Sequence, residues 1–413
     1  MVRLSRWFVA CTLVVSSVLA LAAQSADPLR ERARRLHRNM LVLDCHADLA
    51  VFAEKDTMPA RIADPGMAGP GYDASTDPGQ APIADNWTKT FPPGAWRMDE
   101  RHADGYWDIP RARAGSLKAQ FFAVYMDREP RPGMAVKRTL DQIEAVHAVC
   151  EKHPRDLALV TTAAGIRDAV RGGRIAVVIG VEGGYMIEDD IRVLRLYHRL
   201  GVRYLTLTHS FNTHWADSSG TGRPVTPQHN GLSPFGREVV AEMNRLGMMV
   251  DVTHVSDKTF YDTLAVSKAP IIASHSSTDA IKEHPRNMSD DMLRALARAG
   301  GVIHIDAVIA YIDPIKRSGT PISVLVDHIE HALKVAGPDH VGIGFDYGYD
   351  APAPVDLEDV SKLENLTYEM LKRGIDEPTI RKIWGENTLR VMSEVERVGE
   401  RLRLGKMGAR DKG

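Results

Sequence analysis

The sequence predicts an α/β fold: a (β/α)8 TIM barrel with a long insertion after the first strand and extra helices at the C-terminus. Eight short apolar runs alternate with longer segments of helical periodicity. Their apolar residues are consecutive, as in parallel strands that are buried on both faces. The 413 residues can hold one barrel of about 250 residues plus insertions. Two domains of roughly 150–200 residues each are the alternative from length alone, but eight repeats favour a closed barrel.

Residues 1–23 have the pattern of a secretory signal peptide. Arg3 and Arg6 precede an apolar run, and Ala20 and Ala22 supply small residues at the spacing that a signal peptidase recognises. We therefore expect an exported protein, periplasmic or secreted, that keeps no stable membrane anchor after cleavage. The alternative is an uncleaved anchor helix, although the run is short for a span of about 20 residues.

The barrel domain is expected at residues 28–396, followed by a polar tail at 397–413. A charged amphipathic helix opens it at 28–40. The predicted strands are residues 41–45, 119–126, 175–181, 203–208, 248–253, 270–274, 301–306 and 341–345.

Start and stop signals mark the helices between the strands. Residues 136–153 carry one apolar stripe. Residues 233–247 open on Ser-Pro and close on Gly, and residues 289–301 open on Ser-Asp-Asp and close on Gly-Gly. Residues 357–373 and 377–396 are predicted to pack on the outside as terminal helices.

The stretch from Phe52 to Ile109 interrupts this alternation. It is rich in Pro, Gly and Asp, contains Trp87, Trp96 and Trp107, and shows little periodicity. A long segment without periodicity fits a compact domain only as a functional insertion. We therefore expect it to form a long excursion over the mouth of the barrel.

Charge and cysteine content exclude some function classes. The chain has 52 Lys and Arg against 54 Asp and Glu, so no basic footprint indicates nucleic acid or a membrane surface. Two cysteines remain after the predicted signal peptide, Cys45 and Cys150. A large domain is stable without a disulfide framework, so both are expected to be reduced and buried, with a bridge between them as the alternative.

Six of the eight predicted strands end in residues that can bind metal or titrate. The carboxyl ends of the strands form the face on which barrel active sites are built. His46 and Asp48 point to the same side, because side chains alternate along a strand. Imidazole and carboxylate suit zinc, and a pair of ions about 3.5–4 Å apart activates water. The strand-end residues are His46, Asp48, Glu182, His209, His254, His275 and Asp346.

Each of these residues taken alone has a structural alternative. A single histidine is more often hydrogen-bonded than a ligand, and Glu182 could accept backbone donors in a turn. His304, inside the seventh strand, is an alternative ligand, and His214 is an alternative substrate contact. Eight other histidines lie in predicted helices or loops and are expected to be structural or solvated: His37, His102, His147, His153, His198, His229, His284 and His340.

Several motifs together resemble those of the membrane (renal) dipeptidase family, the M19-type metallopeptidases. The similarity runs from about residue 40 to residue 393. The motifs are LDCHADL, DIPRARAGSLKAQFFAVY, VVIGVEGG, RYLTLTHSFNTHWADSS, VDVTHVSDKTF, IIASHSS, HPRNMSDDMLR, VGIGFDYG and IWGENTLRVM.

The resemblance implies two Zn²⁺ ions per subunit. His46, Asp48 and Glu182 would hold one ion, with Glu182 bridging to a second that His254 and His275 complete. A water bridging the two ions would supply the nucleophilic hydroxide.

The same resemblance assigns the other site residues. Asp346 would take the proton of the water and pass it to the leaving amine. His209 would polarise the scissile carbonyl, Arg286 would clamp the substrate carboxylate, and Tyr311 would line the substrate site.

These assignments imply an exported metallodipeptidase whose substrates include dipeptides with a C-terminal D-residue. One alternative is a binuclear amidohydrolase acting on N-acyl amino acids, lactones or β-lactams, and another is a non-catalytic exported binding protein. Phe211 replaces a cysteine that forms a disulfide in the animal relatives, the first loop is longer, and the eighth strand ends FDYGYD. A homodimer remains an alternative, but the replacement of this cysteine by Phe211 argues against a covalent dimer.

Overall fold

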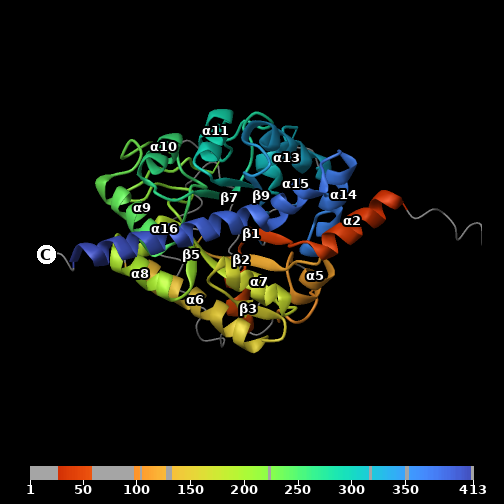
Figure 1. Ribbon diagram of the computed structural model, residues 1–413, viewed down its shortest axis with the longest axis horizontal. Helices are drawn as coiled ribbons and strands as arrows, with labels where there is room; N and C mark the ends of the chain where they lie inside the picture. Colours follow the sequence, from red (N-terminus) through yellow and green to blue (C-terminus); the bar gives the residue numbers. More distant parts are fainter. Residues whose placement is uncertain are drawn as a thin grey trace, which may run out of the picture.

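The computed structural model describes residues 27–57, 97–102, 105–126, 133–221, 225–315, 319–348 and 353–410 (Figure 1). The predicted signal peptide at 1–23 lies outside the described residues. So does most of the predicted insertion, including Trp87 and Trp96.

The eight predicted strands form one parallel barrel, which confirms the fold class. They are hydrogen-bonded in chain order, and β3 (Leu157–Leu159) is an extra strand that pairs with the start of β4. Ala47 forms a parallel bridge with Tyr347, which closes the last strand on the first. The barrel strands are β1 (Leu43–Ala47), β2 (Ala119–Tyr125), β4 (Ile175–Glu182), β5 (Val202–Thr206), β6 (Met249–Asp251), β7 (Ile272–Ser276), β8 (Val302–Ile305) and β9 (Val341–Ile343).

Helices surround the barrel (Figure 1). The predicted caps are present, because the Ser233 side chain accepts from the amide of Gly236 and Ser289 accepts from that of Met292. The helices are α2 (Pro28–Asn39), α3 (Ala50–Thr57), α5 (Ile109–Ala114), α6 (Ala135–Lys152), α7 (Ala163–Arg171), η3 (Gly184–Ile187), α8 (Ile191–Arg199), α9 (Pro234–Leu246), α10 (Asp257–Val266), α11 (Asp290–Arg298), α12 (Ile309–Ile312), α13 (Ile322–Ala336), η4 (Val360–Lys362), α14 (Leu363–Lys372), α15 (Glu377–Arg381), η5 (Lys382–Glu386) and α16 (Asn387–Arg410).

Three elements differ from the prediction. Strand β3 was not predicted, and helix α3 extends from Ala50 into the segment that shows little periodicity in the sequence. Helix α16 continues to Arg410, past the predicted end at residue 396, and Val398 on it is buried. The helix therefore extends into the predicted tail, and the domain boundaries stay a prediction.

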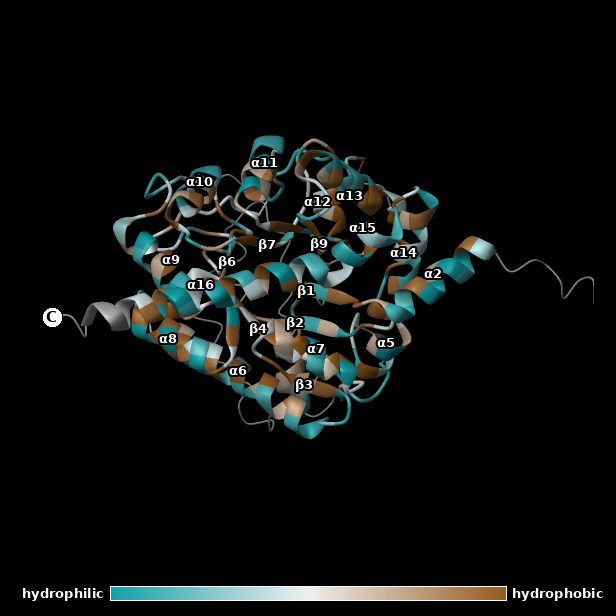
Figure 2. Cartoon of the chain, in the orientation of Figure 1, coloured by the Kyte–Doolittle hydropathy of each residue, from teal (hydrophilic) through white to brown (hydrophobic). Residues whose placement is uncertain are grey.

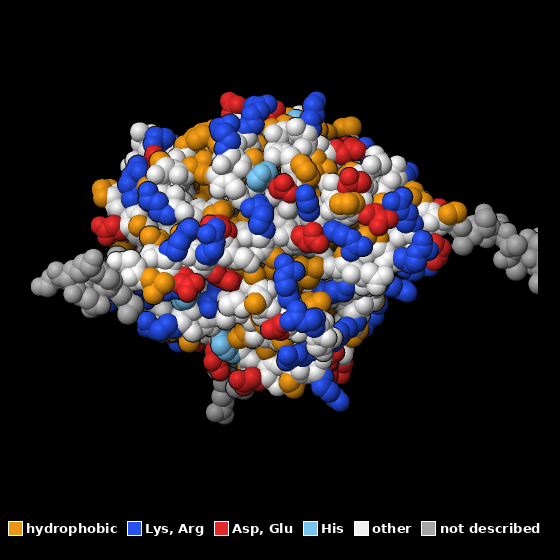
Figure 3. All heavy atoms as spheres, viewed as in Figure 1, with side chains coloured by type: hydrophobic (Ala, Val, Ile, Leu, Met, Phe, Trp, Pro, Cys, Tyr) orange, Lys and Arg blue, Asp and Glu red, His pale blue; other side chains and the backbone are white. Residues whose placement is uncertain are grey.

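Helix α16 lies against the amino-terminal end of the barrel. Leu389, Met392 and Val395 belong to one buried cluster with residues from the starts of the strands, such as Leu43 and Ala119. In Figure 2 the strands carry much brown, whereas the surrounding helices show both colours. Figure 3 shows the α16 side of the molecule, where basic and acidic side chains are interspersed. The predicted strand-end residues lie at the opposite end of the barrel, where the strands have their carboxyl ends.

Both cysteines are free and buried, as predicted. Within the described residues, no helix combines the length and the apolar character that crossing a membrane requires.

Three buried histidines join elements of the fold. His37 contacts Thr367 and the carbonyl of Gly115, His304 contacts the carbonyl of Ala273 and Thr388, and His328 contacts Thr278 and the carbonyl of Ile312. Burial lowers the pKa of each imidazole from 6.5 to about 4. The folded state therefore keeps them neutral at pH values where the unfolded chain binds protons.

We expect the contribution of these three imidazoles to the stability of the fold to decrease as the pH falls from 7 to 5. Each of these imidazoles stabilises the fold fully above its unfolded pKa of 6.5 and loses that contribution as the pH falls toward about 4. Between the folded and the unfolded pKa, the free energy of unfolding changes by up to about 1.4 kcal/mol per pH unit for each group. Urea unfolding of the parent and of His328→Asn at pH 7, 6 and 5 measures this contribution, because the carboxyl groups of Asp306 and Asp346, with pKa values raised to about 7, act in the opposite direction in both proteins. The stability advantage of the parent over the variant should decrease as the pH falls, and a difference that is the same at pH 7 and pH 5 contradicts the prediction.

Candidate metal centre

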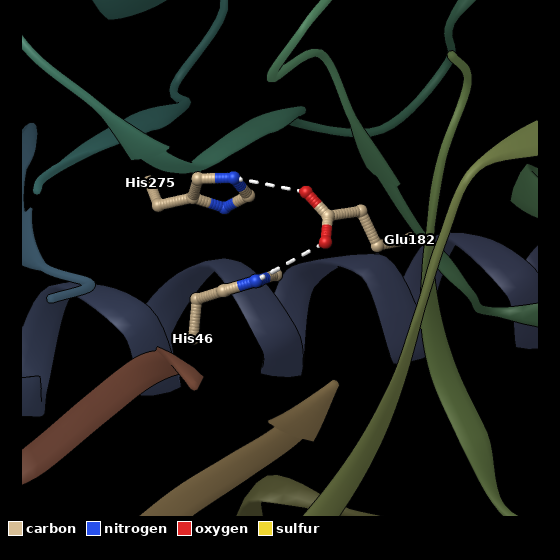
Figure 4. Close-up of side chains that lie close together, drawn as sticks. All are labelled: His46, Glu182 and His275. Atoms are coloured by element: carbon tan, nitrogen blue, oxygen red, sulfur yellow. Dashed lines mark ion pairs between the residues drawn. The ribbon is translucent and has the colours of Figure 1, made fainter. Parts of the chain in front are cut away.

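Glu182 lies at the centre of a cluster of imidazoles at the carboxyl end of the barrel. It ends β4 and is 2% exposed. Its Oε1 lies 2.9 Å from His254 Nε2 and 3.0 Å from His275 Nε2, and its Oε2 lies 3.5 Å from His46 Nε2. Figure 4 shows the carboxylate of Glu182 beside the rings of His46 and His275, with one oxygen directed at each ring. One carboxylate therefore contacts imidazoles from three strand ends.

Two further carboxylates face His46. Its Nε2 lies 3.6 Å from Asp48 Oδ1 and 3.6 Å from Asp346 Oδ1. Three overlapping groups have their ligand atoms close enough to share a metal ion: His46, Glu182 and His275; Glu182, His209 and His254; and His46, Asp48 and Asp346. The structure thus brings all seven predicted strand-end residues together.

Irregular backbone places several of these side chains. The register shifts between Asp44 and Ala47 in β1 and between Ala273 and Ser276 in β7, next to His46 and His275. Such irregularities re-aim side chains beside active sites.

Two of the strand-end residues have left-handed backbone. His254 has φ 66° and Asp346 has φ 59°, a region that non-glycine residues rarely adopt. Strain of this kind persists where the surroundings enforce it, and it gathers at functional sites.

The spacing of the donor atoms fits a divalent cation. Ligands at about 2.0–2.1 Å from a tetrahedral zinc lie about 3.3–3.4 Å from one another. The Nε2 atoms of His254 and His275 are 3.3 Å apart, and three carboxylate oxygens lie 3.5–3.6 Å from His46 Nε2. A set of nitrogen and oxygen donors at this spacing is chemically suited to zinc.

The charges within the cluster are strongly coupled. Burial disfavours the charged form of His46, but Glu182, Asp48 and Asp346 outweigh it and hold the pKa of this imidazole well above 6.5. Burial likewise raises the pKa of Glu182, yet His46 and His275 hold it well below its usual value. Without metal, a proton on His46 balances the carboxylate, and a bound cation would take over that role.

The other two imidazoles are kept neutral. Burial, followed by the charge of Arg286, holds the pKa of His254 well below 6.5, and burial followed by His46 does so for His275. Neutral imidazole is the form that binds metal.

Asp346 has the environment of a carboxyl group that exchanges protons. Burial raises its pKa to about 7, His46 opposes this, and Asp48 and Glu182 add to it. Its side chain keeps 20% exposure, so it stays accessible from the site.

The three residues predicted to bind substrate lie on the same rim. His209 Nε2 is 3.9 Å from Glu182 Oε1. Arg286 is 3% exposed and donates from Nη2 to the carbonyl of His275, while its Nε and Nη1 have no hydrogen-bond partner among the described residues. Its guanidinium carbon lies 5.4 Å from the ring centre of Tyr311. A buried guanidinium with free donors is suited to a carboxylate.

The two alternative histidines are placed elsewhere. Both ring nitrogens of His304 are hydrogen-bonded, to the carbonyl of Ala273 and to Thr388, so the alternative that it is a ligand is wrong. His214 is exposed and pairs with Asp189 at 2.7 Å.

Three residues of the site were not predicted. Asp306, just after β8, is fully buried, and burial raises its pKa to about 7, with Arg286 lowering and Asp346 raising it. It ends the seventh apolar run, a position that could have identified it.

The other two lie inside strands. The hydroxyl of Tyr204 lies 2.8 Å from His46 Nδ1. Asp251 accepts from the hydroxyl of Ser274, whose Oγ lies 2.9 Å from His275 Nδ1. A Cβ at Gly180 would lie 2.0 Å from the ring of Tyr204, so a glycine inside β4 was the signal for this close approach.

Comparison with protein families gives one match over nearly the whole chain. The sequence model of the membrane dipeptidases, peptidase family M19, matches residues 30–406.

Solved structures of similar fold agree with this match. The dipeptidase AC, a metallopeptidase of family M19, shares 25% identity and a TM-score of 0.70, covering 86% of this chain and 98% of its own. A metallopeptidase from Rhodobacter sphaeroides, liganded with a phosphinate mimic of the dipeptide L-Ala-D-Ala, shares 24% identity and a TM-score of 0.70, covering 86% and 99%. The probable dipeptidase PvdM from Pseudomonas aeruginosa shares 23% identity and a TM-score of 0.73, covering 90% and 99%.

Proposed function

Because this chain belongs to the membrane dipeptidase family, peptidase family M19, and is therefore a metallopeptidase that acts on small peptides, we propose a specific reaction for it. It hydrolyses dipeptides with a free C-terminal carboxylate, including those that end in a D-residue, and uses two Zn²⁺ ions. The observation that carries this proposal is the position of Glu182, whose two oxygens face different imidazoles.

In this proposal the donors form two ligand groups that share Glu182, whose Oε2 faces His46 and whose Oε1 faces His254 and His275. His46 and Asp48 complete the first group, and His254 and His275 complete the second. When bound, two cations lower the pKa of a shared water, so that hydroxide is available near neutral pH.

Asp346 is the proposed acid–base residue. Its Oδ1 lies 3.6 Å from His46 Nε2, and its side chain is partly exposed. From this position it takes a proton from the attacking water and returns it to the leaving amine.

His209, Arg286 and Tyr311 orient the substrate. His209 donates to the scissile carbonyl oxygen as negative charge develops on it. Arg286 pairs its free Nε and Nη1 donors with the C-terminal carboxylate, and Tyr311 packs beside it. The ligand of the Rhodobacter sphaeroides relative, which mimics L-Ala-D-Ala, supports a D-residue at the C-terminal position.

Residues 1–23 supply the proposed location: export by a cleaved signal peptide, to the periplasm or outside the cell. A homodimer stays a prediction, which the mass of the purified protein tests.

A substrate panel on metal-analysed protein tests the proposal. We expect hydrolysis of L-Ala-D-Ala and of L-Ala-L-Ala, loss of activity after chelation, and recovery with zinc. N-acetyl-L-Ala-D-Ala should be a poor substrate, because a dipeptidase recognises the free amine. Preference for the acetylated compound would favour the N-acyl amino acid amidohydrolase instead, and activity that survives complete metal removal would refute the zinc mechanism.

A further inference from the structure

A small polar cluster lies beneath His275, inside the barrel. Its four members lie at the end of β5, at and just after the end of β6, and inside β7, and they are almost completely buried: Thr206, Asp251, Thr253 and Ser274. Asp251, its only acidic member, belongs to none of the three candidate groups of metal ligands.

Asp251 is the centre of this cluster. Its Oδ2 accepts from the hydroxyls of Thr206 at 2.5 Å and Ser274 at 2.6 Å. Its Oδ1 accepts from the hydroxyl and the amide of Thr253 at 2.8 and 3.1 Å and from the amide of Ser274 at 2.9 Å. Five donors fix the orientation of this carboxylate, as a buried polar group requires.

The protons of the cluster determine the tautomer of His275. Ser274 has one hydroxyl proton, which it donates to Asp251 Oδ2. Its Oγ also lies 2.9 Å from His275 Nδ1, so at this contact Oγ accepts and Nδ1 donates. The lone pair of His275 is therefore on Nε2, 3.0 Å from Glu182 Oε1. Two lone pairs face each other at that contact, an arrangement that a cation stabilises.

We propose that Asp251 is a positioning residue for the metal centre, acting through Ser274 to fix the tautomer and the ring orientation of His275. The proposal rests on the proposed function, since it concerns a ligand of the second ion. Partners of this kind around a metal site typically change metal affinity by about 10–100-fold when they are removed.

The other imidazoles differ in their support. His46 Nδ1 contacts the hydroxyl of Tyr204 at 2.8 Å, and His254 Nδ1 has no hydrogen-bond partner among the described residues. The Asp251 cluster therefore acts on His275 specifically.

Two substitutions test this inference, each of which removes a hydroxyl that donates to Asp251 Oδ2. Ser274→Ala breaks the connection to His275, whereas Thr206→Val removes a donor from Asp251 Oδ2 without touching an imidazole. We expect Ser274→Ala to weaken zinc binding by about 10–100-fold in a chelator competition and to alter the visible spectrum of the Co²⁺-substituted protein. Thr206→Val should keep the parent spectrum and affinity within about twofold.

Asp251→Asn provides a second route if Ser274→Ala does not fold. With an amide at position 251, the Ser274 hydroxyl can turn its proton toward His275 Nδ1, so zinc affinity and the Co²⁺ spectrum should again change. Parent-like affinity and spectrum in the folded Ser274→Ala or Asp251→Asn protein overturn the inference. So do equal losses in Ser274→Ala and Thr206→Val, which would mean general packing. A parent protein that binds no zinc and cleaves no dipeptide instead refutes the proposed function itself.

Discussion

Replacing Asp346 by asparagine should leave the metal bound and lower kcat by about 10²–10⁴-fold, the usual contribution of a positioned acid–base group. Asparagine keeps the size and shape of the side chain but cannot take a proton from water or return one to an amine. Its neighbour His46 keeps its other two acidic contacts, with Asp48 and Glu182. The measurement is kcat and KM for L-Ala-D-Ala on protein whose zinc content has been determined.

Asp48→Asn is the matched control for this variant. Asp48 and Asp346 each place an oxygen 3.6 Å from the same ring nitrogen of His46. If Asp48 is a ligand and Asp346 is the base, the first substitution lowers zinc content and the second does not. Equal loss of zinc in both variants would make Asp346 a ligand, and an unchanged kcat in Asp346→Asn would exclude it as the base.

The convergence of the strand-end residues could be predicted because it follows from topology. Parallel strands joined in order place all their carboxyl ends at one face, so Glu182 and His275 meet although they lie 93 positions apart in the chain. No knowledge of register or side-chain conformation is needed for that conclusion.

The supporting residues could not be predicted in the same way. Asp251 lies opposite Thr206 on one side and Ile272 on the other, and this placement depends on the register between neighbouring strands. The left-handed backbone of His254 has a similar origin, since its carbonyl accepts from Thr208 and from the amide of Ser219. Contacts that form only after the barrel closes leave no periodic signal in the sequence.

Local elements were missed for a different reason. Strand β3 has three residues, too few to show a pattern, and helix α3 leads directly into the segment rich in Pro and Gly. Arg286 shows the opposite case, because its polar HPRN segment is typical of an exposed loop while its side chain is buried. Only the family resemblance indicated its place.

Replacing Glu182 by alanine should have the largest effect of all, because it removes a ligand from both proposed ions at once. Metal centres of this kind supply several kcal/mol of transition-state stabilisation, so turnover should fall by roughly 10³-fold or more. Zinc content should fall as well. Protein that retains two zinc ions and parent activity after this substitution would show that Glu182 does not bridge the ions.

Glu182→Gln separates the loss of charge from the loss of packing. Zinc that binds only the folded state raises the melting temperature of the parent, and this rise should be reduced or absent in Glu182→Gln. Glu242→Gln is the matched control, since Glu242 is also a buried acid but pairs with Arg195 and Arg245 on the outside of the barrel. A zinc-dependent rise that is lost in the first variant and kept in the second places the cation requirement at Glu182. An equal rise in both would mean that zinc stabilises the fold from another site.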